Sequence, residues 1–386
     1  MVTGLLVAAA LLWAGPAAAD CVPEFPYTRW LGADAAYSIP LPNGRSLWLF
    51  GDTFIAARGK TTRKGARMVA NTIGLSSCEK GRFAVSYSWR GSSAAAAAYF
   101  EPKDAGIKYW PLDGFAYAGK IYVALSRIRD VKEGLGFANA GTDLASITVG
   151  TGTPTSWKVE YAAVSADTSA YLGSSIVVEN GYAYLFSAIE GGEHPAALAR
   201  LPLRFVNLPA EHLEYLAQDG SWKPGFVVAD AKRVIDGAST EMSVRRHDDM
   251  GLWVAVHGAA GFPSSGIAVR TAKEFTGPWS KAAILATYAE TDGANKSGLF
   301  CYAAKEHPEF GKRGELMATY ACNATDLKTV VAQPELYRPR TRRIALAAQV
   351  PSVKPGSAKR AAPAKKKAAG KKPAAPKARR GRDSNP

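Results

Sequence analysis

The stretch G-A-D-A-A-Y-S-I-P-L-P-N-G-R-S-L-W-L-F-G-D, residues 32–52, contains the structural unit that recurs along the chain. It consists of two apolar runs joined by Asn43-Gly44, a dipeptide typical of a tight β-hairpin turn. Four further stretches follow the same plan, with a small or polar opening, a first strand, a turn and an apolar second strand. Their first strands open near residues 113, 174, 241 and 301. The pattern predicts a repetitive all-β protein.

The spacing of these openings, roughly 60 to 80 residues, suits a four-stranded blade with generous loops. Five such units predict a five-bladed β-propeller over residues 20–345, and a pair of β-sandwiches is the structural alternative. In a blade, the first strand begins at the face where the second strand ends. Residues at both places should therefore surround one end of the propeller axis: Asp34, Asp113, Ser174, Glu241 and Tyr302 from first strands, and Asp52, Arg127, Glu190, His257 and Asn323 from second strands.

Four acidic members of this set are candidates for catalysis, namely Asp34, Asp52, Asp113 and Glu241. Carboxyl groups that converge at short range raise one another's pKa, and glycoside hydrolysis needs one protonated carboxyl beside an ionised one. Each Asp also has a simpler interpretation as a turn or capping residue. Glu241 stands where a strand should begin, so a turn role explains it less easily. Our hypothesis is that Glu241 is the general acid and that Asp34 or Asp52 is the base or nucleophile.

Several neighbours are candidates for substrate binding. Tyr37, Trp110 and Tyr302 could stack on sugar rings, with core packing as the alternative, and Arg127 could bind hydroxyl or carboxylate groups. His257 could contact the substrate or lie near a structural cation at the propeller axis. No cofactor and no metal site are expected, because no Cys/His ligand spacing, G-x-S-x-G or G-x-G-x-x-G motif occurs.

The net charge of +15, from 48 Lys and Arg against 33 Asp and Glu, is concentrated at the C-terminal end. Residues 351–386 carry +11, which leaves only +4 for the rest of the chain. Residues 346–386 are rich in Lys, Ala and Pro and are predicted to be a disordered tail. We expect an anionic cell-envelope polymer or lipid head group as its partner, and no specific nucleic acid.

Residues 1–19 are predicted to be a signal peptide, with an apolar run followed by Ala17-Ala18-Ala19 as a cleavage site. This predicts a secreted or periplasmic protein, and we expect a monomer. Export also makes disulfides plausible for the four cysteines, which allow three pairings. We expect Cys21–Cys78 and Cys301–Cys322.

The segments G-A-D-A-A-Y-S-I-P-L (32–41), L-F-G-D-T (49–53), Y-W-P-L-D-G (109–114), T-G-P-W-S (276–280) and L-Y-R-P-R (336–340) resemble a bacterial and phage propeller family. That family was catalogued as domain of unknown function 4185, is related in architecture to five-bladed arabinanases and fructosidases, and includes endo-D-arabinanases. The resemblance implies catalytic acids at Asp34, Asp52 and Glu241, and an Asp113 that tunes the pKa of the acid.

The resemblance therefore implies an exported glycoside hydrolase that cleaves an arabinan-type furanoside polysaccharide, D-arabinan included, by paired-carboxylate catalysis. The alternative is a non-catalytic propeller that binds glycans or serves as an envelope-associated scaffold, because a fold alone does not establish an activity.

Overall fold

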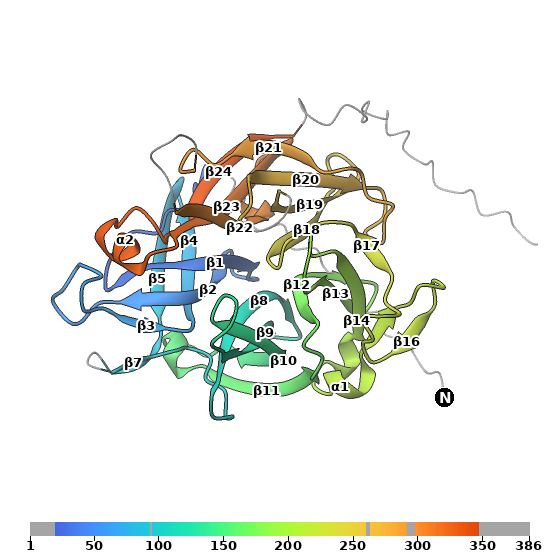
Figure 1. Cartoon of the computed structure of the whole chain (residues 1–386), viewed down its shortest axis with the longest axis horizontal. Coiled ribbons are helices and arrows are strands. Elements are labelled where there is room, and N and C mark those ends of the chain that lie inside the picture. The colour runs from blue at the N-terminus through green and yellow to red at the C-terminus, as the bar shows by residue number, and fades with distance from the viewer. Residues whose placement is uncertain (1–19, 93–94, 260–262, 292–297, 347–386) are drawn as a thin grey trace, which may run out of the picture. The chain divides into compact units, whose positions relative to one another are not determined.

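The structure is a computed structural model that describes residues 20–92, 95–259, 263–291 and 298–346. The predicted signal peptide and the predicted tail beyond Leu346 lie outside these residues. Within them, five small antiparallel sheets form a five-bladed β-propeller, as predicted (Figure 1). Strands β1, β8, β12, β18 and β22 are the innermost strands of the five blades, and each begins the sheet to which it belongs.

Blades 1 to 3 contain most of the strands. Blade 1 consists of β1 (Trp30–Pro40), β2 (Ser46–Ile55), β4 (Thr72–Glu79) and β5 (Arg82–Ser88), with β3 (Arg67–Val69) paired to β2. Blade 2 consists of β8 (Ile107–Tyr117), β9 (Lys120–Asp130), β10 (Phe137–Thr148) and β11 (Lys158–Ser165). Blade 3 consists of β12 (Ala170–Glu179), β13 (Tyr182–Ile189), β14 (Ala196–Pro202), β15 (Glu214–Leu216) and β16 (Trp222–Pro224), with β17 (Arg233–Ile235) paired to β14.

Blade 4 has four strands, and blade 5 has three among the described residues. Blade 4 consists of β18 (Met242–His247), β19 (Leu252–Gly258), β20 (Gly266–Ala272) and β21 (Ala283–Thr287); blade 5 consists of β22 (Leu299–Glu306), β23 (Glu315–Ala324) and β24 (Arg340–Ala345). The remaining elements are short: the ribbon β6 (Arg90–Gly91) with β7 (Ala96–Ala97), the helices α1 (Pro209–His212) and α2 (Leu327–Ala332), and the 3₁₀ turns η2 (Pro154–Ser156), η3 (Leu203–Phe205) and η4 (Pro308–Phe310). None of the described helices is long and apolar enough to cross a membrane.

The predicted turns join the inner strands of four blades. Asn180 and Gly181 both have positive φ, at 48° and 80°, as a two-residue turn between twisted strands requires. Blade 5 differs, because η4 and residues 311–314 connect β22 to β23 in place of a tight turn. The inner strands are apolar on both faces, as in the buried stretch Leu47–Phe50, because each blade packs between two others.

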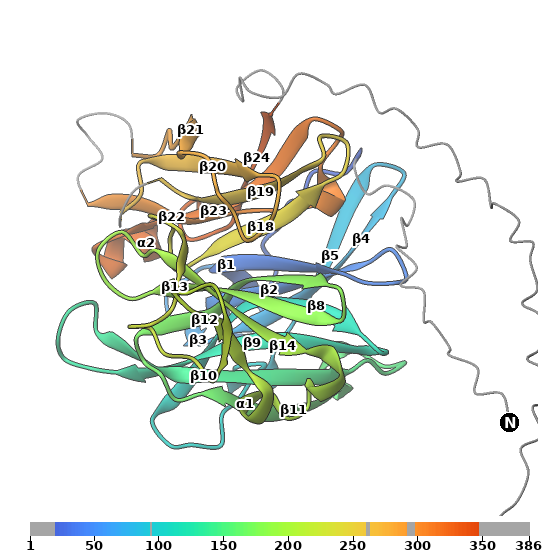
Figure 2. The same ribbon diagram turned by 90° about the vertical axis from the view of Figure 1, so that its right-hand side faces the viewer.

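The sheets of the five blades are arranged around one axis (Figures 1 and 2). Apolar clusters pack between successive blades. Tyr37 and Leu49 of blade 1, for example, pack with Val123 of blade 2. The cluster between blades 5 and 1 also includes Cys21 and Phe25, which precede the first strand. The N-terminal segment of the described chain therefore takes part in closing the ring.

The closure of the ring rests on three further contacts of this N-terminal segment. Thr341 of β24 donates a hydrogen bond to the Pro23 carbonyl at 2.7 Å, and Arg343 of the same strand donates to the Cys21 carbonyl at 3.2 Å. The disulfide between Cys21 and Cys78 joins the segment to β4 of blade 1. The last strand of the propeller and its first blade are thus connected through residues 21–25.

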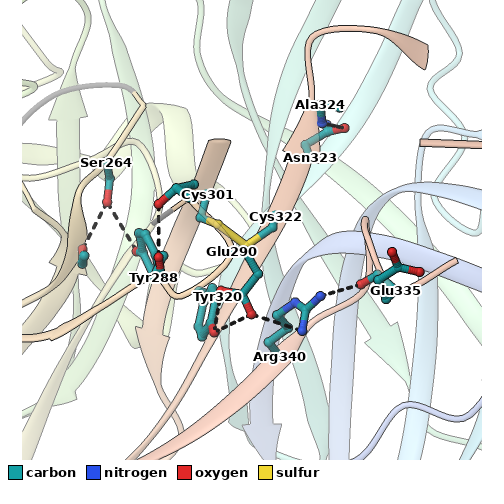
Figure 3. The surroundings of a disulfide bond; sticks show 12 residues. Ser264, Tyr288, Glu290, Cys301, Tyr320, Cys322, Asn323, Ala324, Glu335 and Arg340 are labelled. Atoms are coloured by element: carbon teal, nitrogen blue, oxygen red, sulfur yellow. Dashed lines mark hydrogen bonds and ion pairs between the residues drawn. A yellow bond between two sulfur atoms is a disulfide. The ribbon is translucent and has the colours of Figure 1, made fainter. Parts of the chain in front are cut away.

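The second predicted disulfide, Cys301–Cys322, is also present and links opposite partners of β22 and β23 (Figure 3). Glu290 lies beside it, where its carboxylate accepts hydrogen bonds from Tyr320 at 3.2 and 3.3 Å and pairs with Arg340 at 3.1 Å. Both sulfur atoms are consumed by the disulfide, so Glu290 and the two cysteines are not a metal-ligand set.

We predict that loss of the Cys21–Cys78 disulfide destabilises the fold more than loss of Cys301–Cys322. The two bridges close loops with sequence separations of 57 and 21 residues, and the chain-entropy relation gives about 4 and about 3 kcal/mol for them. The first also holds the segment that closes the ring. Denaturant unfolding of the Cys21→Ser/Cys78→Ser and Cys301→Ser/Cys322→Ser proteins measures the difference, and an equal or reversed order would contradict it.

Candidate active site

The carboxyl group of Asp34, on the innermost strand of blade 1, receives hydrogen bonds from two tyrosines. The Tyr302 hydroxyl donates to Asp34 Oδ2 at 2.6 Å, and the Tyr337 hydroxyl donates to the same oxygen at 3.2 Å. Tyr302 lies on β22, whereas Tyr337 lies in the segment between α2 and β24. Both hydrogen bonds to Asp34 therefore come from blade 5, the last blade, which lies next to blade 1 where the ring closes.

The pKa of Asp34 is raised from 3.8 to about 7, mainly by burial and then by the negative charges of Glu241 and Asp52. The two tyrosine hydrogen bonds act in the opposite direction, because they stabilise the ionised carboxylate. Three predicted acids, from blades 1 and 4, are therefore electrostatically coupled. Near neutral pH this arrangement keeps a proton on Asp34 for part of the time.

Glu241, directly before β18, pairs with a buried lysine that the sequence did not identify. Lys305 Nζ lies 2.8 Å from Glu241 Oε2 and also donates to the backbone carbonyls of Ala303, at 2.7 Å, and Ala35. Its side chain is 1% exposed, and burial lowers its pKa, whereas the charge of Glu241 opposes that shift. These three acceptors match the three hydrogens of an ammonium group, so Lys305 is fixed in place beside the Glu241 carboxylate.

Asp52, on β2, is held by Trp110 of blade 2. The Trp110 indole N–H donates to Asp52 Oδ1 at 3.1 Å, and Lys108 lies 5.5 Å from the centre of the Trp110 ring. Burial raises the pKa of Asp52, and the charge of Lys108 and the Trp110 hydrogen bond oppose this shift. Asp52 and Trp110 were both predicted to belong to the site, and the structure brings them into contact.

Asp113, by contrast, is fully buried and has no oxygen exposed for substrate. Its Oδ2 accepts hydrogen bonds from Arg245 at 2.8 Å, from the Ile176 amide at 2.8 Å and from Ser175 at 3.2 Å, and its Oδ1 accepts from the Gly114 amide. This burial does not favour a direct contact between Asp113 and a substrate, and its predicted role, as an acid or as a residue that tunes the pKa of the acid, stays a prediction. Asp113 joins the innermost strands of blades 2, 3 and 4.

Irregular strand pairing creates these contacts. The register between innermost and second strands shifts in four blades, next to Asp34, Asp113, Ser174 and Tyr302. In blades 1 and 5 the shifts coincide with alanines in the left-handed region, with φ of 60° for Ala35 and 62° for Ala303. Such β-bulges redirect side chains and backbone carbonyls. The two alanine carbonyls accept hydrogen bonds from Lys305.

A buried arginine holds the segment that carries Tyr337. Arg63 is 4% exposed, and its guanidinium donates to the carbonyls of Leu31, Val330 and Leu336 at 2.9, 2.7 and 2.6 Å. It also donates to the Tyr27 hydroxyl and to the carbonyls of Gln333, Pro334 and Tyr337. These bonds connect the start of β1 to residues 330–337. The position of the Tyr337 hydroxyl on Asp34 therefore depends on Arg63.

Gly51, the residue before Asp52, leaves room for the other carboxyl oxygen of Asp34. A Cβ atom at position 51 would lie 2.3 Å from Asp34 Oδ1, which is shorter than any real contact of this kind. The glycine of the L-F-G-D-T segment is thus explained by the close approach of a neighbouring strand's carboxylate.

Two of the predicted substrate contacts, Tyr37 and Tyr302, lie at this cluster, whereas Arg127 pairs elsewhere. Tyr37 is 1% exposed, donates its hydroxyl hydrogen to the Ser174 carbonyl and packs against Lys305, so these contacts favour core packing, and its stacking on a sugar stays a prediction. The guanidinium of Arg127 pairs with Asp143 and Asp104, all within or beside blade 2. Tyr302 acts through its hydroxyl on Asp34, and its ring remains partly exposed.

His257 does not fit a cation site. It is 1% exposed; its Nδ1 bonds to the Gly258 carbonyl at 2.8 Å, and its Nε2 accepts a hydrogen bond from Arg270 at 3.3 Å. Both ring nitrogens are thus occupied, and burial lowers the pKa of His257 to about 4. The adjacent guanidinium would repel a metal ion, so His257 is a structural residue of blade 4.

The class of protein is a five-bladed β-propeller with coupled carboxyl groups near its axis. Residues 26–346 match the family described as Domain of unknown function (DUF5005), and the chain belongs to this family. The sequence resemblance pointed to domain of unknown function 4185, and this family assignment is not confirmed. No curated protein matches the chain.

Solved structures share the fold at low sequence identity. One is a Bacteroides ovatus protein provisionally named a hydrolase, which is 19% identical with a TM-score of 0.67, over 83% of this chain and 87% of that protein. Another is the GH43_1 enzyme from Xanthomonas citri, solved with xylotriose, which is 14% identical with a TM-score of 0.48, over 85% of this chain and 92% of that enzyme. At such identities the likeness concerns the fold.

The electrostatic coupling around Asp34 predicts opposite pKa shifts in two variants. Tyr302→Phe removes a donor to the carboxylate and should raise the pKa of Asp34 further, by about one unit. Glu241→Gln removes a neighbouring negative charge and should lower it. NMR titration of the Asp34 carboxyl carbon in each protein measures both, and shifts of the same sign would contradict the proposed coupling.

Proposed function

We propose that the protein is an exported glycoside hydrolase that cleaves an arabinan-type furanoside polysaccharide, with D-arabinan the first polymer to test. The observation that carries this proposal is the cluster of Asp34, Glu241 and Asp52, in which burial and the two neighbouring charges raise the pKa of Asp34 to about 7 and Lys305 pairs with Glu241. Glycoside hydrolysis needs a carboxyl that still holds its proton at working pH and a second one that does not.

We assign the roles in the reverse of the order expected from the sequence. Asp34 is the general acid, because burial and two neighbouring negative charges retain its proton. Glu241 is the carboxylate that attacks the sugar or activates water, because the Lys305 ammonium lies 2.8 Å from it and stabilises negative charge. Asp52 raises the pKa of Asp34 and is available to bind sugar hydroxyls.

The remaining parts of the proposal concern the location and partners of the enzyme. The two disulfides agree with a secreted or periplasmic protein. The basic residues beyond Leu346 attach the enzyme to an anionic envelope polymer or lipid surface. The enzyme acts as a monomer on a polysaccharide and needs no cofactor.

Replacement of the acids should abolish hydrolysis and leave the fold intact. We expect Asp34→Asn and Glu241→Gln each to reduce the rate of oligosaccharide release from D-arabinan or plant arabinan by at least about 100-fold. Circular dichroism and thermal unfolding verify the fold, and chromatography of the released sugars measures the rate.

Glu101→Gln is the matched control, because Glu101 is an exposed carboxylate outside the site. It should retain full activity. A wild-type protein that releases no product from any furanoside polymer, but still binds one, would favour the non-catalytic glycan-binding propeller.

The role of Asp34 also predicts the pH profile. A general acid must be protonated, so kcat/KM should fall as the pH rises through about 7, the pKa of Asp34. Tyr302→Phe should move this limb to higher pH, because the ionised form loses a hydrogen bond. If the pH at which kcat/KM falls is the same in Tyr302→Phe and in the wild type, the group that titrates is not Asp34.

A further inference from the structure

A cavity of about 620 Å³ lies between the outer parts of blades 3 and 4. The hairpin β15–β16, strand β17 and residues 276–279, which belong to the T-G-P-W-S segment, provide most of its lining. Asp34, Asp52 and Glu241 are not among the residues that line it. Its volume is within the range of sites that bind small organic molecules or single sugar units.

Two tryptophans line this cavity, Trp222 of β16 and Trp279 of the T-G-P-W-S segment. Both are partly buried. The Arg200 guanidinium lies 4.2 Å from the centre of the Trp222 ring, and the Trp279 indole N–H donates to the Phe275 carbonyl at 3.2 Å. These contacts fix the rings within the wall. Rigid aromatic walls beside polar groups are a common way to bind the apolar face of a sugar.

The charge of the cavity is positive. Lys232, Arg233 and Arg270 line it together with one acidic residue, Asp236. Among the described residues, none of the three cations forms an ion pair with a carboxylate; Arg270 donates to the backbone carbonyls of Asp236, Gly237 and Ser280, and Lys232 and Arg233 are exposed. Arg270 also lies in the field of Asp236 and Glu193, so Lys232 and Arg233 are the described cations of this cavity that are free to pair with a ligand.

We propose that this cavity is a second carbohydrate-binding site, which takes an anionic sugar unit such as a uronic acid. The carboxylate would pair with Arg233 and Lys232, and the sugar ring would lie against Trp222 and Trp279. An arginine can bind a carboxylate through two parallel hydrogen bonds, whereas a neutral sugar would leave these cations unused. The two disulfides agree with a protein outside the cytoplasm, where it would meet extracellular polysaccharides.

The proposal goes beyond the proposed hydrolysis and does not require it. A site on the outer surface of blades 3 and 4 would hold a polysaccharide that carries acidic units while the chain is cut elsewhere. Binding there is measurable in a protein that does not hydrolyse, so failure of one proposal is distinguishable from failure of the other.

The test uses the full chain with Glu241→Gln, so that no sugar is cut during titration. Calorimetry with trigalacturonic acid should show binding that xylotriose, a neutral trisaccharide, does not show. Trp222→Ala and Arg233→Ala should each weaken that binding by about 10-fold or more, whereas Trp222→Phe should largely preserve it. Inorganic phosphate and galacturonic acid monomer serve as further probes, and they separate recognition of charge alone from recognition of a sugar acid.

The basic residues beyond Leu346 could also attract an acidic oligosaccharide, and the variants separate the two sites. Lys103→Ala removes an exposed charge elsewhere and should leave the affinity unchanged. Equal affinity in wild type, Trp222→Ala and Arg233→Ala would overturn the proposal, as would equal binding of xylotriose and trigalacturonic acid. The proposal would also be overturned if a short oligonucleotide bound more tightly than trigalacturonic acid and if that binding depended on Trp222, because the ligand would then be a nucleic acid.

Discussion

The ion pair between Lys305 and Glu241 is the interaction on which the geometry of the site depends. A carboxylate near the centre of a propeller loses much of its hydration, so it needs a partner at hydrogen-bonding distance. Lys305 supplies that partner and ties Glu241 of blade 4 to the backbone of blades 1 and 5 through Ala35 and Ala303. Asp113 with Arg245 repeats the same solution among blades 2, 3 and 4. Among the described residues, Asp34 has no cation at hydrogen-bonding distance, and burial raises its pKa to about 7.

Glu241 has a lysine partner and Asp34 has none at hydrogen-bonding distance in the described chain, and this difference follows from β-bulges in the innermost strands. An ideal inner strand would direct alternate side chains to opposite neighbouring blades. The bulges at Ala35 and Ala303 interrupt this alternation and direct two carbonyls at Lys305. The cost of two alanines with positive φ is local strain, which the surrounding hydrogen bonds must offset.

Sequence reasoning predicted the five blades well, because Asn-Gly turns and apolar runs are local signals. The same register identified Asp34, Asp52 and Glu241 as neighbours, and their electrostatic coupling agrees with it. It missed Lys305, Arg63 and Tyr337. A lysine in an apolar strand or an arginine in the polar stretch T-T-R-K-G carries no local sign of burial, since its partners are backbone carbonyls far away in the chain. Asp113 and Tyr37 are buried rather than exposed, and the register of their strands shifts next to them, which the sequence pattern did not indicate.

The proton on Asp34 also affects the stability of the fold. The folded pKa, about 7, is above the ordinary value of 3.8, so folding favours the protonated form. The corresponding stability is fully present below pH 3.8 and is lost as the pH rises through about 7, by at most about 4 kcal/mol and less because Asp34 is partly exposed. The closed ring and two disulfides provide stabilisation of similar size. A site that keeps a carboxylic acid ready to donate its proton therefore requires a rigid scaffold around it, and the buried hydrogen bonds of Arg63 and Lys305 are part of that scaffold.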